Sequence, residues 1–249
     1  MKKALLIVFS MIMVLALVAT TGCGKKKELV MATNASFPPY EYWEGGKIVG
    51  IDAELAELIA DEIGMKLTIV DTEFGSIVAG VQTGKYDIGM AGMSITEARL
   101  KEVNFSKEYA TAKQVIIVKP GSPIVDCDWL YDNVGKFKVG VQQDTTGHIY
   151  CTDDFGEDNV LAYKTGNDAV QALIANKVDC VIIDNEPAKK YVESNNAGLK
   201  ILDAEYVEES YAIAIAKGNT ELLDKVNKAL DKFINDGTVD KIVKKYIHD

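Results

Sequence analysis

Short apolar segments alternate with amphipathic ones along most of this 249-residue chain, and this alternation restricts the fold more than any other feature. The clearest helix is expected over 52–63, where Asp52 can cap the start and Gly64 can supply a left-handed exit. Strands are expected over 66–70, 87–90, 114–118, 138–141, 178–183, 200–202 and 211–216, and further helices over 76–83, 168–176, 187–193, 220–234 and 239–246. Such alternation predicts an α/β fold of mainly parallel sheets with helices on both faces.

Two segments in different halves of the chain share one arrangement. Residues 81–92 (VQTGKYDIGMAG) and 172–184 (ALIANKVDCVIID) each contain a helix end, a turn with a lysine, an aspartate and an apolar strand. Gly92 and Asp184 follow these aspartates at the same spacing, where ligands of open α/β sheets bind. The similarity predicts two lobes that face one cleft, with a chance match of turn residues as the alternative.

The N-terminus has the pattern of an export signal. Lys2 and Lys3 precede an apolar run over 4–19, which is shorter than the roughly 20 residues needed to cross a bilayer. Gly22-Cys23 resembles a bacterial lipobox, in which the signal is cut before the cysteine and the cysteine sulfur is acylated. We therefore expect a signal peptide over 1–22, a lipidated tether over 23–28 and an extracytoplasmic protein anchored to the cell membrane. A retained membrane anchor is the alternative.

Composition excludes several classes of function. A formal net charge of −10 disfavours a nucleic-acid partner, because such proteins need a basic surface. With only two histidines, a multi-histidine metal centre is excluded, and no cofactor is expected. Cys180 lies in an apolar strand and is expected to be a buried thiol. Cys127 and Cys151 lie in polar stretches and could form a disulfide, which the sequence leaves open.

Several segments, taken in order, resemble one protein family. They are residues 32–42, 46–60, 74–99, 103–119, 139–147, 178–188, 211–219 and 236–246. Together they resemble the polar-amino-acid-binding proteins of bacterial import systems powered by ATP-binding cassettes. The resemblance implies a monomeric, two-lobed protein of the periplasmic-binding-protein-like type II fold that carries a free amino acid to a membrane permease.

The resemblance also implies how the chain is divided. Residues 29–111 and 210–249 form the first lobe, and residues 112–209 form the second. Two crossing segments, near 109–111 and 209–211, act as a hinge. Ligand in the cleft between the lobes favours the closed state by the difference in its affinity for the closed and open states.

For the charged groups of an amino acid, the resemblance implies a specific set of partners. Arg99, the only arginine among 27 basic residues, would hold the carboxylate with its planar fork, helped by the backbone N–H groups of Ser94 and Thr146. Asp184 would accept from the ammonium group, together with the carbonyl of Gly92 and the hydroxyl of Ser94. The alternatives are a surface role for Arg99 and a helix cap for Asp184.

The resemblance also suggests which residues surround the rest of the ligand. Phe37 and Phe74 match aromatic positions that sandwich the aliphatic part, although both would otherwise be assigned to the core. Tyr40 and Trp43 are candidates for the rim. Side-chain specificity is expected from Asn34, Gln142, Asp144 and Gln143. If Asp144 points inward a cationic side chain is favoured; if it points to solvent, as we expect, a neutral polar one is favoured.

Two other functions fit the same fold. One is a dehydratase of an aromatic precursor, for which His148 and Asp144 are the only additional titratable residues expected near the cleft. The sequence shows no pairing of a nucleophile with a base, so we expect a protein that is not an enzyme. The other is the sensing module of a receptor, which would need a separate membrane partner.

Overall fold

The computed structural model describes residues 27–248, apart from the side chains of 203–205. The expected signal peptide, the Cys23 acylation site and most of the tether lie outside the described residues. No helix within 27–248 is long and apolar enough to cross a membrane.

The fold contains two five-stranded sheets and a small three-stranded one. The first sheet has the order β5-β1-β6-β13-β7, from β1 (Glu28–Thr33), β5 (Lys66–Asp71), β6 (Ile88–Gly89), β7 (Val103–Phe105) and β13 (Ala214–Ala216). The second has the order β10-β9-β11-β8-β12, from β8 (Ala110–Val118), β9 (Val139–Gln142), β10 (Val160–Tyr163), β11 (Cys180–Asp184) and β12 (Lys200–Tyr211). The small sheet contains β2 (Ser36–Phe37), β3 (Glu41–Glu44) and β4 (Lys47–Val49).

Both large sheets are mixed. In the first, β1 pairs in parallel with β5 and β6, whereas β13 is antiparallel to β6 and β7. In the second, β9 pairs in parallel with β10 and β11, whereas β8 is antiparallel to β11 and β12. The expected parallel core is therefore present in each lobe, and the antiparallel pairs involve β8, β12 and β13, which follow or form the crossings between lobes.

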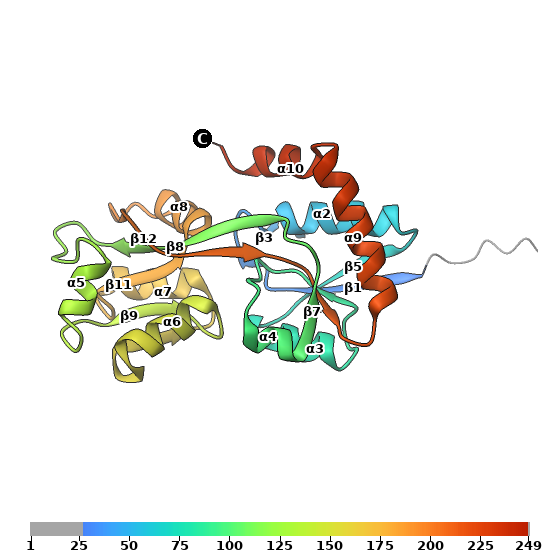
Figure 1. The fold of residues 1–249 in the computed structure, drawn as a ribbon. Helices are drawn as coiled ribbons and strands as arrows, with labels where there is room; N and C mark the ends of the chain where they lie inside the picture. Colours follow the sequence, from blue (N-terminus) through green and yellow to red (C-terminus); the bar gives the residue numbers. More distant parts are fainter. Residues whose placement is uncertain (1–26, 249) are drawn as a thin grey trace, which may run out of the picture.

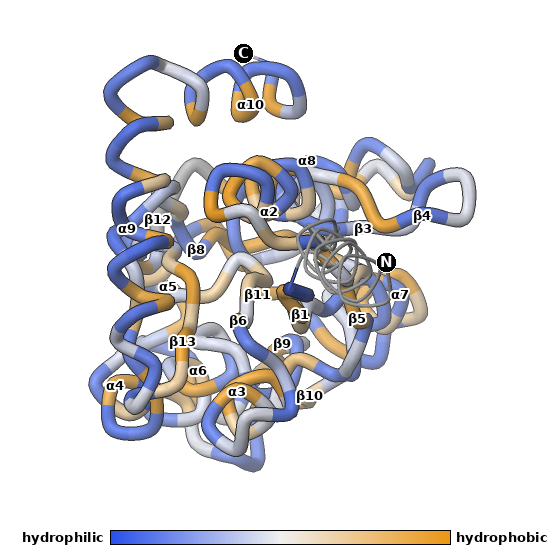
Figure 2. The backbone as a smooth tube through the Cα atoms, turned by 90° about the vertical axis from the view of Figure 1, so that its right-hand side faces the viewer, coloured by the Kyte–Doolittle hydropathy of each residue, from blue (hydrophilic) through white to orange (hydrophobic). Residues whose placement is uncertain are grey.

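Helices cover both faces of each large sheet (Figure 1). Beside the first sheet are α2 (Ile51–Glu62), α3 (Ile77–Gln82), α4 (Glu97–Glu102), α9 (Thr220–Asn235) and α10 (Thr238–Tyr246). Beside the second are α5 (Cys127–Asp132), α6 (Thr146–Phe155), α7 (Gly166–Ile174) and α8 (Asn185–Ser194). Hydrophobic residues of β13 lie inside, whereas much of α9 is hydrophilic (Figure 2). The buried side of α9 carries Leu222, Val226, Leu230 and Phe233.

The strands β8 and β12 connect the two lobes. They lie side by side and pair in antiparallel register from Val118↔Lys200 to Tyr211↔Ala110 (Figure 1). Both are longer than the sequence predicts, because the chain stays extended where it passes between the lobes. The expected lobe boundaries, at 111/112 and 209/210, fall within these two strands and stay a prediction.

Asp52 does not cap the helix that it was expected to cap. The first N–H groups of α2 donate to backbone carbonyls instead, including Asp52 N–H to Tyr40 O at 2.9 Å. The Asp52 side chain is therefore available for a tertiary contact. Its Oδ2 accepts from Gly92 N–H at 2.8 Å and from the Tyr109 hydroxyl at 2.9 Å. The expected exit at Gly64 is confirmed by its φ of 74°.

The disulfide between Cys127 and Cys151 that the sequence left open is not formed. Cys151 and Cys180 are both fully buried, and each is a free thiol. The expectation for Cys180 is thus confirmed, and Cys151 is not bonded to Cys127. Burial in the apolar core raises the pKa of the Cys151 thiol well above its ordinary value.

We predict that Gly50→Ala destabilises the fold severely. Gly50 has a φ of 124°, and an added Cβ would lie 2.2 Å from the backbone oxygen of Tyr40. Backbone strain and this overlap are expected to lower the free energy of unfolding by about 3 kcal/mol or more. Urea denaturation provides the measurement.

Gly46→Ala is the matched control. Gly46 also has a positive φ, of 79°, but an added Cβ meets nothing within 4 Å. It should cost only the backbone strain, about 1 kcal/mol. Equal losses in the two variants would show that the contact with Tyr40 is not the cause.

Candidate ligand-binding site

Nine of the residues expected from the sequence to contact the ligand line one buried cavity between the lobes. The lining side chains approach one another so closely that the free space between them is only about 10 Å³, roughly the space of one water molecule. The lining residues are Asn34, Phe37, Glu41, Phe74, Ala91, Gly92, Ser94, Arg99, Gln142, Thr145, Thr146 and Asp184. The structure thus brings these residues together around one site, and their contact with a ligand stays a proposal.

Arg99 enters the cavity from α4. The Thr96 hydroxyl accepts from the Arg99 N–H and caps this short helix. The guanidinium donates from Nη1 to Ser94 O at 2.7 Å and from Nη2 to Asp144 O at 3.3 Å, across the gap between the lobes. Its Cζ lies 5.1 Å from the centroid of the Phe74 ring. Arg99 is only 9% exposed, so a surface role is excluded.

The first turn of α6 lies on the opposite side of the cavity. Thr145 is the N-cap residue, and its side chain accepts from His148 N–H. Thr146 is the first residue of this ten-residue helix and is buried against the cavity. Free N–H groups and the helix dipole make such a terminus favourable for an anion. Together with Arg99, it makes one part of the cavity suitable for a carboxylate.

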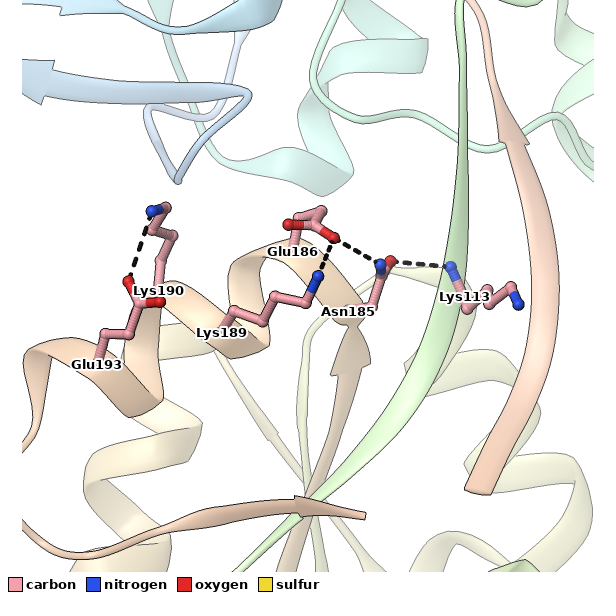
Figure 3. Close-up of polar contacts among 6 residues, drawn as sticks. All are labelled: Lys113, Asn185, Glu186, Lys189, Lys190 and Glu193. Atoms are coloured by element: carbon pink, nitrogen blue, oxygen red, sulfur yellow. Dashed lines mark hydrogen bonds and ion pairs between the residues drawn. The ribbon is translucent and has the colours of Figure 1, made fainter. Parts of the chain in front are cut away.

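Asp184 lies at the carboxyl end of β11, where α8 begins. Contacts of the next residues hold this junction in place (Figure 3). Asn185 Oδ1 accepts from Lys113 N–H of β8 at 3.1 Å, and Asn185 Nδ2 donates to Glu186 Oε1 at 2.9 Å. Asp184 occupies the N-cap position of α8 but makes no capping hydrogen bond with its side chain. Instead, its Oδ1 accepts from the Tyr211 hydroxyl. The helix-cap alternative is therefore wrong.

The Asp184 carboxyl lies in an electrostatically unfavourable environment. Burial is the main cause that raises its pKa, to about 7, and the nearby carboxylate of Glu209 raises it further. The hydrogen bond from Tyr211 opposes this rise. A cationic group in the cavity would therefore stabilise the ionised form of Asp184.

Asn34 and Gln142 meet across the cavity. Gln142 Nε2 donates to Asn34 Oδ1 at 2.9 Å, and Asn34 Nδ2 donates to Thr72 O at 2.8 Å. Each amide thus uses one of its two N–H donors within the protein, whereas Gln142 Oε1 is buried without a donor. This part of the cavity therefore offers acceptors.

The sequence analysis missed Glu41. It is fully buried, it lines the cavity, and no donor in the described structure reaches either of its carboxyl oxygens. Burial and the adjacent Asp52 carboxyl raise its pKa well above the ordinary value. The turn at 38–40 could have pointed to Glu41. In the β2–β3 hairpin that this turn forms, Glu41 lies opposite Phe37, which was expected to contact the ligand.

Four other residues considered from the sequence do not line the cavity. Asp144 and Gln143 are exposed, so the expectation that Asp144 points to solvent agrees with the structure. Tyr40 is 2% exposed and packs edge-to-face on Tyr211 at 5.0 Å between centroids, so it is not a rim residue. Trp43 is exposed and donates from Nε1 to Asp71 Oδ2 at 2.8 Å.

Direct contacts hold the lobes together around the cavity. Besides the Gln142–Asn34 and Arg99–Asp144 bonds, the Tyr191 hydroxyl donates to Ser36 O at 2.6 Å. Phe37 and Phe74, which line the first-lobe side, are at most 9% exposed. Within residues 27–248, no cluster of histidine, cysteine, aspartate or glutamate could hold a metal ion.

We predict that Asp184→Asn stabilises the ligand-free protein in a pH-dependent way. A pKa raised from 3.8 to about 7 means that the ionised carboxyl disfavours folding by about 4 kcal/mol above pH 7. This penalty vanishes below pH 4, where the carboxyl is protonated in both the folded and unfolded states. Asparagine has no such penalty and can still accept from the Tyr211 hydroxyl.

Urea denaturation of both proteins between pH 4 and pH 8 measures the difference in unfolding free energy. It should grow as the pH rises from 4 to 7 and then stay constant. Asp224→Asn, an exposed change on α9, is the control and should produce little difference. A difference for Asp184→Asn that does not depend on pH would contradict the electrostatic cause.

Comparison with known proteins identifies the family. The family of bacterial extracellular solute-binding proteins, family 3, matches residues 29–249. The chain belongs to this family. The resemblance that the sequence segments suggested, and the two-lobed α/β fold that it implied, are thereby confirmed.

Individual relatives are similar over most of their length. The chain is 35% identical over 261 residues to the Arginine-binding extracellular protein ArtP of Bacillus subtilis (strain 168), covering 99% of this chain and 98% of the relative. It is 40% identical to the structure of an ancestral arginine-binding protein bound to glutamine, with a TM-score of 0.83, covering 90% of this chain and 99% of that one. It is 32% identical to the ancestral amino acid-binding protein AncCDT-1, a precursor of cyclohexadienyl dehydratase, with a TM-score of 0.81, covering 88% and 95%.

Proposed function

We propose that this protein captures a free L-amino acid between its lobes and delivers it to the permease of an ABC importer. The observation that carries the proposal is that Arg99 and Asp184 line the same cavity between the lobes. A zwitterion carries the two charges that these side chains complement. The matched family and the arginine-binding relative support the same assignment.

The main-chain end of the ligand pairs with fixed partners. Its carboxylate accepts from the Arg99 guanidinium and from the N–H groups of Ser94 and of Thr146 at the start of α6. Its ammonium group donates to Asp184 and to the carbonyl of Gly92. Each charge-assisted hydrogen bond in such a site contributes about 1.5–3 kcal/mol. Phe37 and Phe74 enclose the aliphatic part.

The side chain of the ligand carries a hydrogen-bond donor. Gln142 Oε1 and both carboxyl oxygens of Glu41 are buried acceptors without donors, whereas the Asn34 amide already donates to Thr72. Arginine and glutamine satisfy this requirement, whereas glutamate does not. An ancestral relative has been solved with glutamine bound, which supports the same class.

Charge favours arginine over glutamine. Among the described residues, Arg99 is the only basic side chain that lines the cavity, whereas two acids, Glu41 and Asp184, line it. Two further acids, Asp52 and Glu209, lie close enough to raise the pKa of these two carboxyls. The sequence favoured a neutral side chain because the only additional acid that it considered, Asp144, was expected to point to solvent. With Glu41 in the cavity, we propose a cationic side chain.

Binding without chemistry fits the cavity better than a dehydratase does. That alternative relied on His148 and Asp144, and the cavity is lined by neither. The Asp144 N–H donates to His148 Nδ1 at 3.2 Å, on the surface beside the cavity. The relatives reported above are named as binding proteins, which supports a protein that is not an enzyme.

Calorimetric titration of ligand-free protein with the twenty amino acids tests the proposal. We expect arginine to bind most tightly, glutamine more weakly and glutamate not measurably. Arg99→Lys, which keeps the charge but removes the planar fork, should weaken arginine binding about 10- to 100-fold. Lys101→Gln, an exposed change on the same helix, is the control and should bind like the parent.

Two results would contradict the proposal. If none of the amino acids binds, the function itself is wrong. If glutamate binds as tightly as arginine, the function stands but the donor requirement is wrong.

The chain is also proposed to be a monomer that an acyl group on Cys23 holds at the outer face of the cell membrane. The extracellular family and the sequence around Cys23 support this location. Two acyl chains on one cysteine suffice for stable anchoring, whereas a single chain binds reversibly.

Cys23→Ser tests the anchor. The variant should appear in the soluble extracytoplasmic fraction, whereas the parent should sediment with membranes and enter the detergent phase. The purified variant should bind arginine like the parent, since Cys23 lies outside the cavity-forming residues. A variant that still sediments with membranes would contradict the proposed anchor.

A further inference from the structure

The carboxyl groups of Glu41 and Asp52 form a buried pair in the wall of the cavity. We propose that this pair holds one shared proton, and that the proton leaves when a ligand with a cationic side chain binds. The inference rests on the proposed amino-acid-binding function and adds a proton-linked preference for charge at the same site.

The geometry around the pair requires a proton. Both oxygens of Glu41 and Oδ1 of Asp52 are buried, and no N–H or hydroxyl group of the described residues donates to them. The two carboxyl groups are close enough to influence each other's pKa. Two adjacent buried carboxylates repel each other and have no hydrogen to share, whereas one proton would remove the repulsion and supply a donor.

The proton resides on Glu41. Asp52 accepts from Gly92 N–H at 2.8 Å and from the Tyr109 hydroxyl at 2.9 Å, and both bonds favour its ionised form. Glu41 receives no such donor and is fully buried. Accordingly, the pKa of Asp52 is raised only to about 6 by burial, whereas burial and Asp52 hold the pKa of Glu41 well above its ordinary value.

The groups that face the pair reinforce this assignment. They are Tyr40 just before β3, Asp71 at the end of β5, Tyr109 just before β8, Asp184 at the end of β11 and Tyr191 of α8. None of these groups is basic. Nothing among them can therefore replace the proton as a counter-charge to Asp52.

A cationic ligand side chain can replace it. When a guanidinium enters the cavity, the O–H bond of Glu41 breaks, the proton passes to solvent, and the new carboxylate accepts from the guanidinium. Charge balances because one cation takes the place of another. The neutral amide of glutamine donates to Glu41 without expelling the proton, so only the cationic ligand is linked to its release.

Asp184 also carries a proton near pH 6, because its pKa is raised to about 7. The ammonium group of the ligand expels this proton, and arginine and glutamine both have that group, so Asp184 contributes equally to the proton release by the two ligands. Proton release that depends on the ligand side chain therefore reports on Glu41 and Asp52 alone.

The test is titration calorimetry of the refolded full-length protein at pH 6 in buffers of different ionisation enthalpy, which counts the protons released. Arginine should release up to one more proton from the parent than from Glu41→Gln. The affinity for arginine should also rise more steeply with pH in the parent than in Glu41→Gln. Release of one additional proton makes the ratio of the two affinities grow by up to tenfold per pH unit. Citrulline, the neutral isostere of arginine, should release the same number of protons from both proteins.

Each outcome decides one question. Equal proton release by arginine from the parent and Glu41→Gln would overturn the proposed proton, although amino-acid binding would stand. Should that variant not fold, equal release by arginine and citrulline from the parent would overturn it in the same way. If no amino acid binds to the parent, the proposed function fails first, and the proton-linked preference fails with it.

Discussion

The structure depends on one constraint: charged groups lie in a cavity that is largely closed to water. Arg99 and Asp184 are at most 9% exposed, and Glu41 is fully buried. A buried ion disfavours folding by several kcal/mol unless it is paired or hydrogen-bonded. Arg99 is held by two carbonyl oxygens and Asp184 by the Tyr211 hydroxyl, but neither has a fully compensating charge. The two buried charges therefore disfavour the ligand-free state, and a zwitterionic ligand would stabilise them by placing an opposite charge beside each.

The two-lobed fold is a direct way to assemble such a cavity. Gly92, Gln142 and Asp184 follow or end β6, β9 and β11, three strands that pair in parallel with a neighbour. The carboxyl ends of parallel strands in the two sheets point toward the gap between the lobes. The strands β8 and β12 stay paired where the chain passes between the lobes. We propose that the lobes separate and close about these two strands, and that closure brings the separate charges together.

Much of this could be predicted from local sequence. The strand and helix pattern, the repeated aspartate-strand units and the single arginine are each visible within short windows. They located Gly92, Arg99 and Asp184, which the structure places on one cavity. Asp52 was misassigned for the same reason, since a local rule made it a cap. In the structure, backbone carbonyls of residues 39–50 satisfy the helix N–H groups, and the carboxylate pairs with groups distant in sequence.

The sequence by itself determined the fold class, because hydrophobic periodicity and turn residues act between near neighbours. Its resemblance to a known family supplied the family and most of the residues around the cavity. Only the tertiary structure decided the electrostatic character of the cavity. It buried Glu41 beside Asp52 and left Asp144 exposed, although both outcomes depend on segments far apart in the chain. The physical reason is that the charge a carboxyl carries depends on the surrounding dielectric, donors and charges, which are set only when the lobes are assembled.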